Sequence, residues 1–235
     1  MIFFTAALLI LSAGAAWAQG WERHRITKPP YGLEKVQKLI KGIKEIDGDD
    51  GEESYSALSI REYEGLSFRE KFTYNMINGE TYSQNCDGWP VDPKQDSKIY
   101  GQLESPFGEY HWRKRQLEFF DQNRDSVIAL IRESIGRTGR LGVNYKMVLV
   151  RLKATEMIPL LISTYNLNRK DHDILTVLMQ MMRDGQYAPF LGSASFQKLY
   201  AGDFNSVYDA YLTYNTANEE LIIKRATDFY NGLQH

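Results

Sequence analysis

An apolar pattern that recurs every 30 residues is the feature of this sequence that most restricts its fold. Three segments, residues 124–131, 154–161 and 184–191, align without a gap, and the same four positions are apolar in each. Their spacing is typical of one face of a helix. Pro159 and Pro189 fall at the same position of the second and third segments. Because proline is well tolerated in the first turn of a helix, each proline marks a predicted helix start.

The pattern predicts units of two helices joined by a tight turn, at residues 153–155 in one unit and at 184–185 in the next. One helix pair cannot cover its own apolar face, so neighbouring units must stack and bury a continuous core. Across residues 115–192 the sequence resembles the HEAT-like family of short bacterial α-helical repeats. The resemblance implies an all-α fold of stacked antiparallel helix pairs, an α-solenoid. Its low alanine content departs from the family pattern, and an ordinary helical bundle is the alternative.

The first 18 residues predict an export signal. An apolar run over residues 2–11 is followed by small residues and by Ala16-Trp17-Ala18, an A-x-A cleavage site. The run is too short to span a bilayer, which takes about 20 residues. We therefore expect cleavage near Ala18 and a periplasmic or secreted protein with no transmembrane span. A buried N-terminal helix or a retained anchor is the alternative.

Residues 19–58 form the predicted N-terminal region. It contains an extended lead-in, an amphipathic helix over residues 33–46 and an acidic loop that begins at Asp47. A calcium-loop interpretation of residues 47–58 fails, because Leu58 stands where a bidentate glutamate is needed. No histidine pair has the spacing of zinc ligands, and His172 is interpreted as a surface residue. The sequence therefore predicts no metal and no cofactor.

Residues 59–235 form the predicted helical-repeat domain. Ser59 and Ser67 each open an S-x-x-E capping box, and Thr216 opens a third in the C-terminal capping helices. Another helix is expected to begin at Asp203. Between the helices, residues 79–108 are polar and rich in aromatic residues and in breaks, which predicts irregular but ordered structure.

Cys86 is the single cysteine, so an intramolecular disulfide is impossible. It is either a small buried apolar residue or a reactive thiol, and with His111 it gives the one catalytic pair that the sequence offers, of a hydrolase type. No other catalytic constellation is recognisable, which favours a non-catalytic protein. The net charge of −2 provides no positive field for nucleic acid.

Aromatic and basic residues supply the predicted binding surface. The run from His111 to Arg115 is basic and aromatic, and the segment before it is rich in tyrosine and tryptophan. The predicted surface comprises Tyr82, Trp89, Tyr100, Tyr110, His111, Trp112, Arg113 and Arg115. These residues favour a binding or scaffold module for a protein partner or small ligand of the cell envelope. A self-packed cap, the Cys86/His111 hydrolase and an accessory subunit of an envelope assembly are the alternatives.

Overall fold

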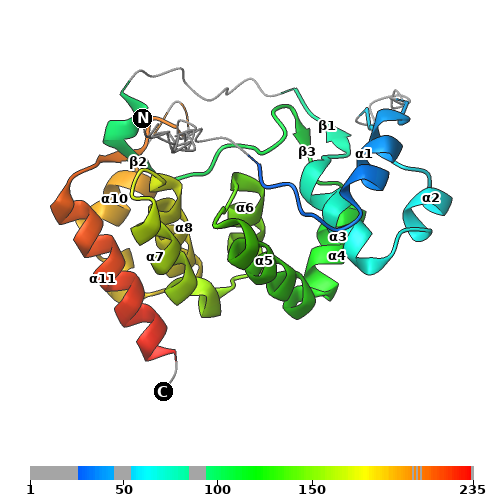
Figure 1. Cartoon of the computed structure of the whole chain (residues 1–235). Helices are drawn as coiled ribbons and strands as arrows, with labels where there is room; N and C mark the ends of the chain where they lie inside the picture. The colour runs from blue at the N-terminus through cyan, green and yellow to red at the C-terminus, as the bar shows by residue number, and fades with distance from the viewer. Residues whose placement is uncertain are drawn as a thin grey trace, which may run out of the picture.

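A computed structural model describes residues 26–44, 54–84 and 94–233, except residues 203, 205 and 207. Helices make up 61% of these residues, in eleven α-helices, and the strands form only small pairs (Figure 1). The prediction of a helical fold is therefore confirmed at the level of fold class. None of the helices described is both long and apolar enough to cross a membrane.

Four helices build one end of the molecule, at the right of Figure 1. They are α1 (Leu33–Lys41), α2 (Ile60–Glu64), α3 (Phe68–Ile77) and α4 (Lys114–Gln122). The predicted helix over residues 33–46 is shorter than expected, because it stops at Gly42. The Gly42 and Ile43 amides bond three residues back, a tightened final turn, and glycine lowers the helix propensity there.

The remaining helices continue toward the other end of the molecule. They are α5 (Arg124–Thr138), α6 (Val143–Arg151), α7 (Ile158–Leu167), α8 (His172–Asp184), α9 (Ala188–Leu191), α10 (Ala194–Tyr200) and α11 (Thr216–Gly232), with a 3₁₀ turn η2 (Thr155–Met157) before α7. Helix α8 packs against α6, α7 and α11. It is the central element of this half, and almost every residue along it is buried.

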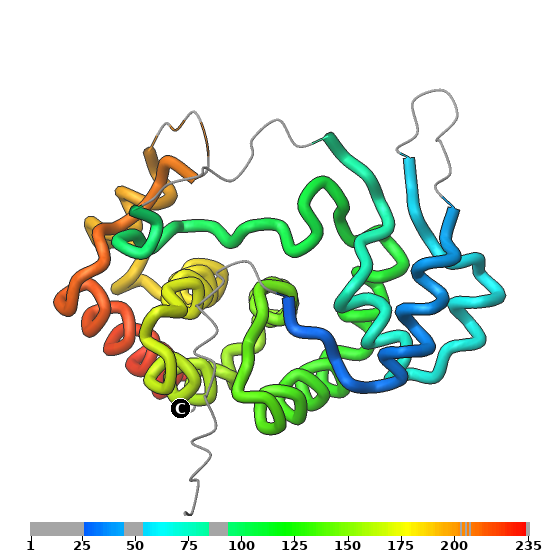
Figure 2. Tube along the Cα trace, turned by 45° about the horizontal axis from the view of Figure 1, so that its top comes forward, coloured from blue at the N-terminus to red at the C-terminus, as the bar shows by residue number. Residues whose placement is uncertain are grey.

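Short strands connect segments that are distant in sequence. Strand β1 (Thr81–Tyr82) pairs with β3 (Tyr110–His111), and β2 (Lys98–Tyr100), after the 3₁₀ turn η1 (Gln95–Ser97), pairs with β4 (Tyr211–Thr213). The chain between β2 and β3 crosses from one end of the molecule to the other (Figure 2). The expected helix that would include Tyr211 is therefore wrong, because these residues complete a strand pair with β2.

The core is one extended cluster with a small satellite. The large cluster runs from Phe72 on α3 to Phe229 on α11. The satellite lies at the N-terminal end, where Val36, Leu58 and Tyr74 pack together beneath α1. Because Leu58 belongs to this satellite, its burial fixes the position of the segment before α2.

Two of the three predicted capping boxes are confirmed. Ser59 and Ser67 each accept a hydrogen bond from the amide of the glutamate three residues on, and both capping boxes are complete. The box predicted at Thr216 is wrong. Asn215 caps α11 instead, and Glu219 turns inward, where it accepts a hydrogen bond from the Tyr214 hydroxyl at 2.7 Å.

Helices α6 and α8 end in the same kind of turn. Each is closed by an amide that bonds five residues back, from Ala154 to the Leu149 carbonyl and from Tyr187 to the Met182 carbonyl. In each turn the residue before that amide is left-handed, Lys153 with φ 47° and Gln186 with φ 54°. This is the Schellman pattern. The two left-handed residues are 33 positions apart, whereas the two prolines are 30 apart, because η2 adds three residues after the first turn.

The lead-in is attached to α6 by a buried set of hydrogen bonds. Asn144 accepts from the Thr27 amide at 3.0 Å and donates to the Thr27 carbonyl at 2.8 Å. The Gly142 amide donates to the Thr27 hydroxyl at 2.7 Å. A Cβ atom at Gly142 would lie 2.2 Å from the Thr27 nitrogen, so this close approach requires glycine.

Candidate functional site

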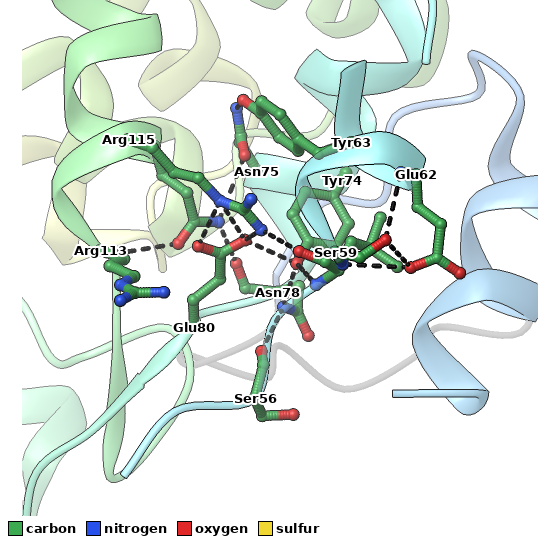
Figure 3. Close-up of polar contacts among 12 residues, drawn as sticks. Ser56, Ser59, Glu62, Tyr63, Tyr74, Asn75, Asn78, Glu80, Arg113 and Arg115 are labelled. Atoms are coloured by element: carbon green, nitrogen blue, oxygen red, sulfur yellow. Dashed lines mark hydrogen bonds and ion pairs between the residues drawn. The ribbon is translucent and has the colours of Figure 1, made fainter. Parts of the chain in front are cut away.

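A buried carboxylate organises the N-terminal end of the molecule. Glu80 lies three residues beyond the end of α3, and its side chain is fully buried. Its oxygens accept hydrogen bonds from Arg115 Nε at 2.8 Å and from Arg115 Nη2 at 2.5 Å (Figure 3). The Tyr74 hydroxyl donates to the same carboxylate at 2.7 Å. The negative charge therefore has a bidentate cationic partner and a neutral donor.

Arg115 connects this carboxylate to the segment before α2. Its Nη2 also donates to the Leu58 carbonyl at 2.7 Å, and its guanidinium lies 4.5 Å from the centre of the Tyr63 ring. Burial disfavours the charge of Arg115, but the hydrogen bonds and the attraction of Glu80 outweigh it and raise the pKa of Arg115. The guanidinium therefore stays charged.

Tyr74 joins the same segment from the other side. Its oxygen accepts from the Leu58 amide at 3.2 Å and from Asn78 Nδ2 at 3.1 Å. Burial, together with the charge of Glu80, raises the pKa of Tyr74, so the hydroxyl remains a donor. Both the amide and the carbonyl of Leu58 are thus held by side chains.

A second layer of amides closes the network. Gln116 donates to the Asn78 carbonyl at 2.8 Å and to Asn75 Oδ1 at 3.2 Å, and Asn75 donates to the Tyr63 hydroxyl at 3.0 Å. The Trp112 indole donates to the Asn75 carbonyl at 2.6 Å. Such a fully paired polar network rigidifies its surroundings. We interpret it as the support of the neighbouring surface.

A basic groove lies beside this network, between α1 and the segment before α2. The volume of this basic groove is about 780 Å³. Its lining is Lys35, Lys38, Leu39, Gly42, Ile43, Lys44, Tyr55, Ala57, Leu58, Ser59, Ile60, Glu62, Arg113 and Arg115. Five of these side chains are cationic and one is anionic. The Ser59 hydroxyl and amide hydrogen-bond to Glu62 and lower its pKa.

The cations of the basic groove differ in their pairing. Lys35 pairs with Glu70 and Arg115 with Glu80. Across the described part of the chain, Lys38, Lys44 and Arg113 have no carboxylate partner. The Arg113 guanidinium instead lies 4.3 Å from the centre of the Tyr55 ring. A groove with unneutralised cations on both banks favours an anion.

The groove continues into a second hollow of about 560 Å³. Tyr55 and Arg113 line both, and the rest of the second lining is Thr81, Ser83, His111, Trp112 and Lys114. No acidic residue belongs to this second lining among the described residues. The positive surface is therefore extended rather than confined to one point.

A third hollow, of mixed polarity, lies beside α2. Its volume is about 460 Å³, and its lining combines apolar residues such as Leu66 and Phe119 with charged ones such as Lys71 and Glu118. Ile60 lines both this hollow and the basic groove, and 78% of its surface is exposed. An apolar side chain this exposed, between two hollows, is available for contact with a partner.

Neither a family model, nor a curated protein, nor a solved structure matches this chain. The function is therefore argued from the geometry of the site.

Five of the residues predicted to form a binding surface lie at this end of the molecule, and three of them line the basic groove or its continuation. Arg113 and Arg115 line the basic groove, and His111 and Arg113 line the second hollow that continues it. Tyr82 and Tyr110 face each other across β1 and β3, with ring centres 5.5 Å apart. These residues come from distant parts of the sequence, and the small sheet brings them together.

The other three predicted surface residues are placed differently. Trp112 lines the second hollow, but its indole nitrogen is already bonded to Asn75 and its ring packs against Phe120. Tyr100 is fully buried beside β4, so it presents no side-chain surface to a ligand. Strand β2 pairs with β4 and packs against α8, and this packing buries Tyr100. Trp89 lies outside the described residues.

Two chemical predictions meet different outcomes. Cys86 lies outside the described residues, so its pairing with His111 stays a prediction. The interpretation of His172 as a surface residue is wrong, because only 7% of it is exposed. Its ring stacks on Tyr214 with centres 3.8 Å apart. The flanking aspartates suggested solvent, but Asp171 is itself buried and paired.

Lys146 and Asp171 form a buried ion pair that sequence reasoning missed. Their side chains are 0% and 5% exposed, with Nζ and Oδ1 2.5 Å apart, and Asp173 lies 3.7 Å from the same nitrogen. The available signal was the position of Lys146 between Tyr145 and Val148, on the buried face of α6. Within the described ranges, no group of three or more His, Cys, Asp or Glu residues is arranged to hold a metal ion.

Proposed function

We propose that this protein is a non-catalytic, exported helical module that binds an anionic ligand in the basic groove. The observation that carries the proposal is the set of three cations, Lys38, Lys44 and Arg113, that line the groove without a carboxylate partner in the described chain. The groove has the size of an ordinary ligand site, for which volumes of roughly 300–1,000 Å³ are typical.

The buried network supports the same proposal. Glu80 neutralises Arg115 from beneath, while Tyr74 and Arg115 fix both polar groups of Leu58. The floor of the groove is therefore held in place before a ligand arrives, which lowers the ordering cost of binding.

The proposal is tested by titrating the mature chain with two anionic probes, poly-L-glutamate and polygalacturonate. Saturable binding of at least one probe is expected, weakening as salt rises from about 50 to about 200 mM because screening reduces surface attraction. The variant Lys38→Glu/Lys44→Glu should weaken binding about tenfold or more, which corresponds to about 1.4 kcal/mol.

A matched control removes the effect of net charge. Arg140→Glu/Lys170→Glu changes the net charge by the same amount at two exposed positions that do not line the groove. It should bind nearly as the unmodified protein does. Equal weakening by both variants, or no binding of either probe, would refute a groove-specific anion site.

Export is the second part of the proposal, and it is supported by the apolar run and the Ala16-Trp17-Ala18 site. N-terminal sequencing of the protein recovered from its native cell should give Gln19 as the first residue. Recovery of intact Met1 in the cytoplasm would contradict export.

We also propose that α6–α7 and α8–α9 are two units of a HEAT-like repeat. The shared Schellman turns support it, as does the proline in the first turn of both α7 and α9. An experimental structure should superpose the two units as adjacent layers. Helix pairs that diverge beyond the turn would favour the helical-bundle alternative.

An accessory role in an envelope assembly is a second candidate. It is favoured by Ile60, an exposed apolar residue that lines both the basic groove and the hollow of mixed polarity beside α2. Ile60→Ser should then weaken association with the partner while leaving the melting temperature unchanged.

A further inference from the structure

An open strand edge runs along the floor of the basic groove. Residues 54–58 lie beside β1, where the Tyr82 amide donates to the Ser54 carbonyl at 2.8 Å and the Ser56 amide donates to the Glu80 carbonyl at 2.7 Å. Tyr55 stands opposite Thr81 as an antiparallel bridge. The segment thus pairs with β1 through one isolated bridge, beside the two-stranded sheet of β1 and β3.

Backbone groups along this segment alternate in direction. Ser54, Ser56 and Leu58 use their polar groups toward β1 and the buried network. In an antiparallel pair of this kind, the intervening residues point their amide and carbonyl the other way. These residues are Tyr55 and Ala57, and both line the basic groove. Their backbone groups make no hydrogen bond with any described residue.

Two outward residues on one edge present a repeat of about 6.8 Å along the strand, since each residue of an antiparallel strand advances about 3.4 Å. An extended peptide presents its own amides and carbonyls with the same repeat. A lipid chain or a sugar chain does not alternate donors and acceptors in this way. The edge therefore selects a peptide backbone.

The side chains around the edge select the composition of that peptide. Lys38 and Lys44 stand on the α1 bank, and Arg113 lies over Tyr55 at the other end. Between them the floor is apolar, with Leu39 and Ile43 among its residues. Cations on the rim and an apolar floor fit a strand that carries both carboxylates and apolar side chains.

We propose that the ligand of the basic groove is an extended acidic segment of a partner protein, which pairs as an added strand with the free edge at Tyr55 and Ala57. The inference rests on the proposed function, because it assumes that the groove binds anions. It adds the class of ligand and the mode of recognition.

The experiment uses the mature chain and three probes. The first is a synthetic octapeptide of alternating glutamate and valine with blocked ends, and the other two are polygalacturonate and vesicles that contain phosphatidylglycerol. Binding is followed by titration, and amide hydrogen exchange is followed by NMR with and without each probe.

The expected result is that the octapeptide binds and slows exchange of the Tyr55 and Ala57 amides about tenfold or more, because both become hydrogen-bonded. Octapeptide binding that leaves both amides unprotected would overturn strand pairing while keeping the proposed function. Binding of polygalacturonate or of vesicles without the octapeptide would also overturn the peptide inference and keep the anion site. Failure of all three probes would overturn both.

A pair of variants tests the edge without altering charge. Ala57→Pro removes the outward amide and should weaken octapeptide binding about fivefold, the change that one lost hydrogen bond of ordinary strength produces. Ala57→Ser keeps the amide and should bind normally. Equal affinity for the two variants would overturn strand pairing, and the exchange measurement decides the matter if the proline variant does not fold.

Discussion

Replacing Glu80 by glutamine should be the most informative change for the stability of the N-terminal end. The substitution keeps the size of the side chain and removes its charge. Arg115 then loses its bidentate partner, and one glutamine oxygen must serve donors that two carboxylate oxygens served before. An amide group now faces a guanidinium, which is donor against donor.

The magnitude follows from the burial of the two partners. Breaking a buried ion pair by removing one partner costs about 3–5 kcal/mol. Arg115 keeps its bond to the Leu58 carbonyl, and its side chain is 24% exposed, so water relieves part of the loss. We therefore expect about 3 kcal/mol, the low end of that range, in the free energy of unfolding.

Equilibrium unfolding in urea measures this change, and about 3 kcal/mol corresponds to a midpoint lower by about 1 M or more. Glu118→Gln is the control, because Glu118 is half-exposed and pairs with Lys114 on the same helix as Arg115, at 3.8 Å. It should cost less than about 0.5 kcal/mol. A loss below about 1 kcal/mol for Glu80→Gln would refute the view that this network supports the groove.

Three further predictions concern other parts of the fold. Gly142→Ala should lower the free energy of unfolding by about 2–3 kcal/mol, measured in urea, because its Cβ would collide with the Thr27 backbone. Gly136→Ala is the control and should be neutral or stabilising, because no atom lies within 4 Å of its Cβ. Equal effects of the two substitutions would contradict the close packing at Gly142. Lys153→Gly should raise the free energy of unfolding by about 0.5–1 kcal/mol, because glycine adopts the left-handed conformation without strain. An unchanged or lower melting temperature would contradict this prediction. Hydrogen bonds from the Ser67 amide and from Lys35 lower the pKa of Glu70 below its usual range. Its contribution to stability is therefore present above that range and is lost as pH falls through the lowered pKa. The melting temperatures of the unmodified protein and Glu70→Gln should therefore converge in acid, and a gap that stays constant would contradict this.

Sequence reasoning succeeded where the cause was local. A capping box lies within four residues, so Ser59 and Ser67 could be read directly. It failed at Thr216, because Glu219 is drawn inward by Tyr214 and by Arg169, contacts that no local pattern carries. The short strands were missed for the same reason, since β2 finds its partner β4 more than a hundred residues later.

The site was partly predictable. The basic run from His111 to Arg115 pointed to this part of the surface, because charge and aromatic character are visible in the sequence, and its binding role stays a prediction. Glu80 carried no such signal, because nothing in its polar sequence surroundings marks it as buried. The opposite bank, with Lys38 and Lys44, appeared only as the polar face of an amphipathic helix. Tertiary packing alone brings the three segments together.

The position of Arg115 has a consequence for how this surface can diverge. Its guanidinium belongs to the buried pair with Glu80 and also to the wall of the basic groove. A substitution of Arg115 therefore changes the stability of the fold as well as the affinity for a ligand. New ligand preferences can therefore arise through Lys38 and Lys44, which make no ion pair within the described chain, while residues 80 and 115 change only together.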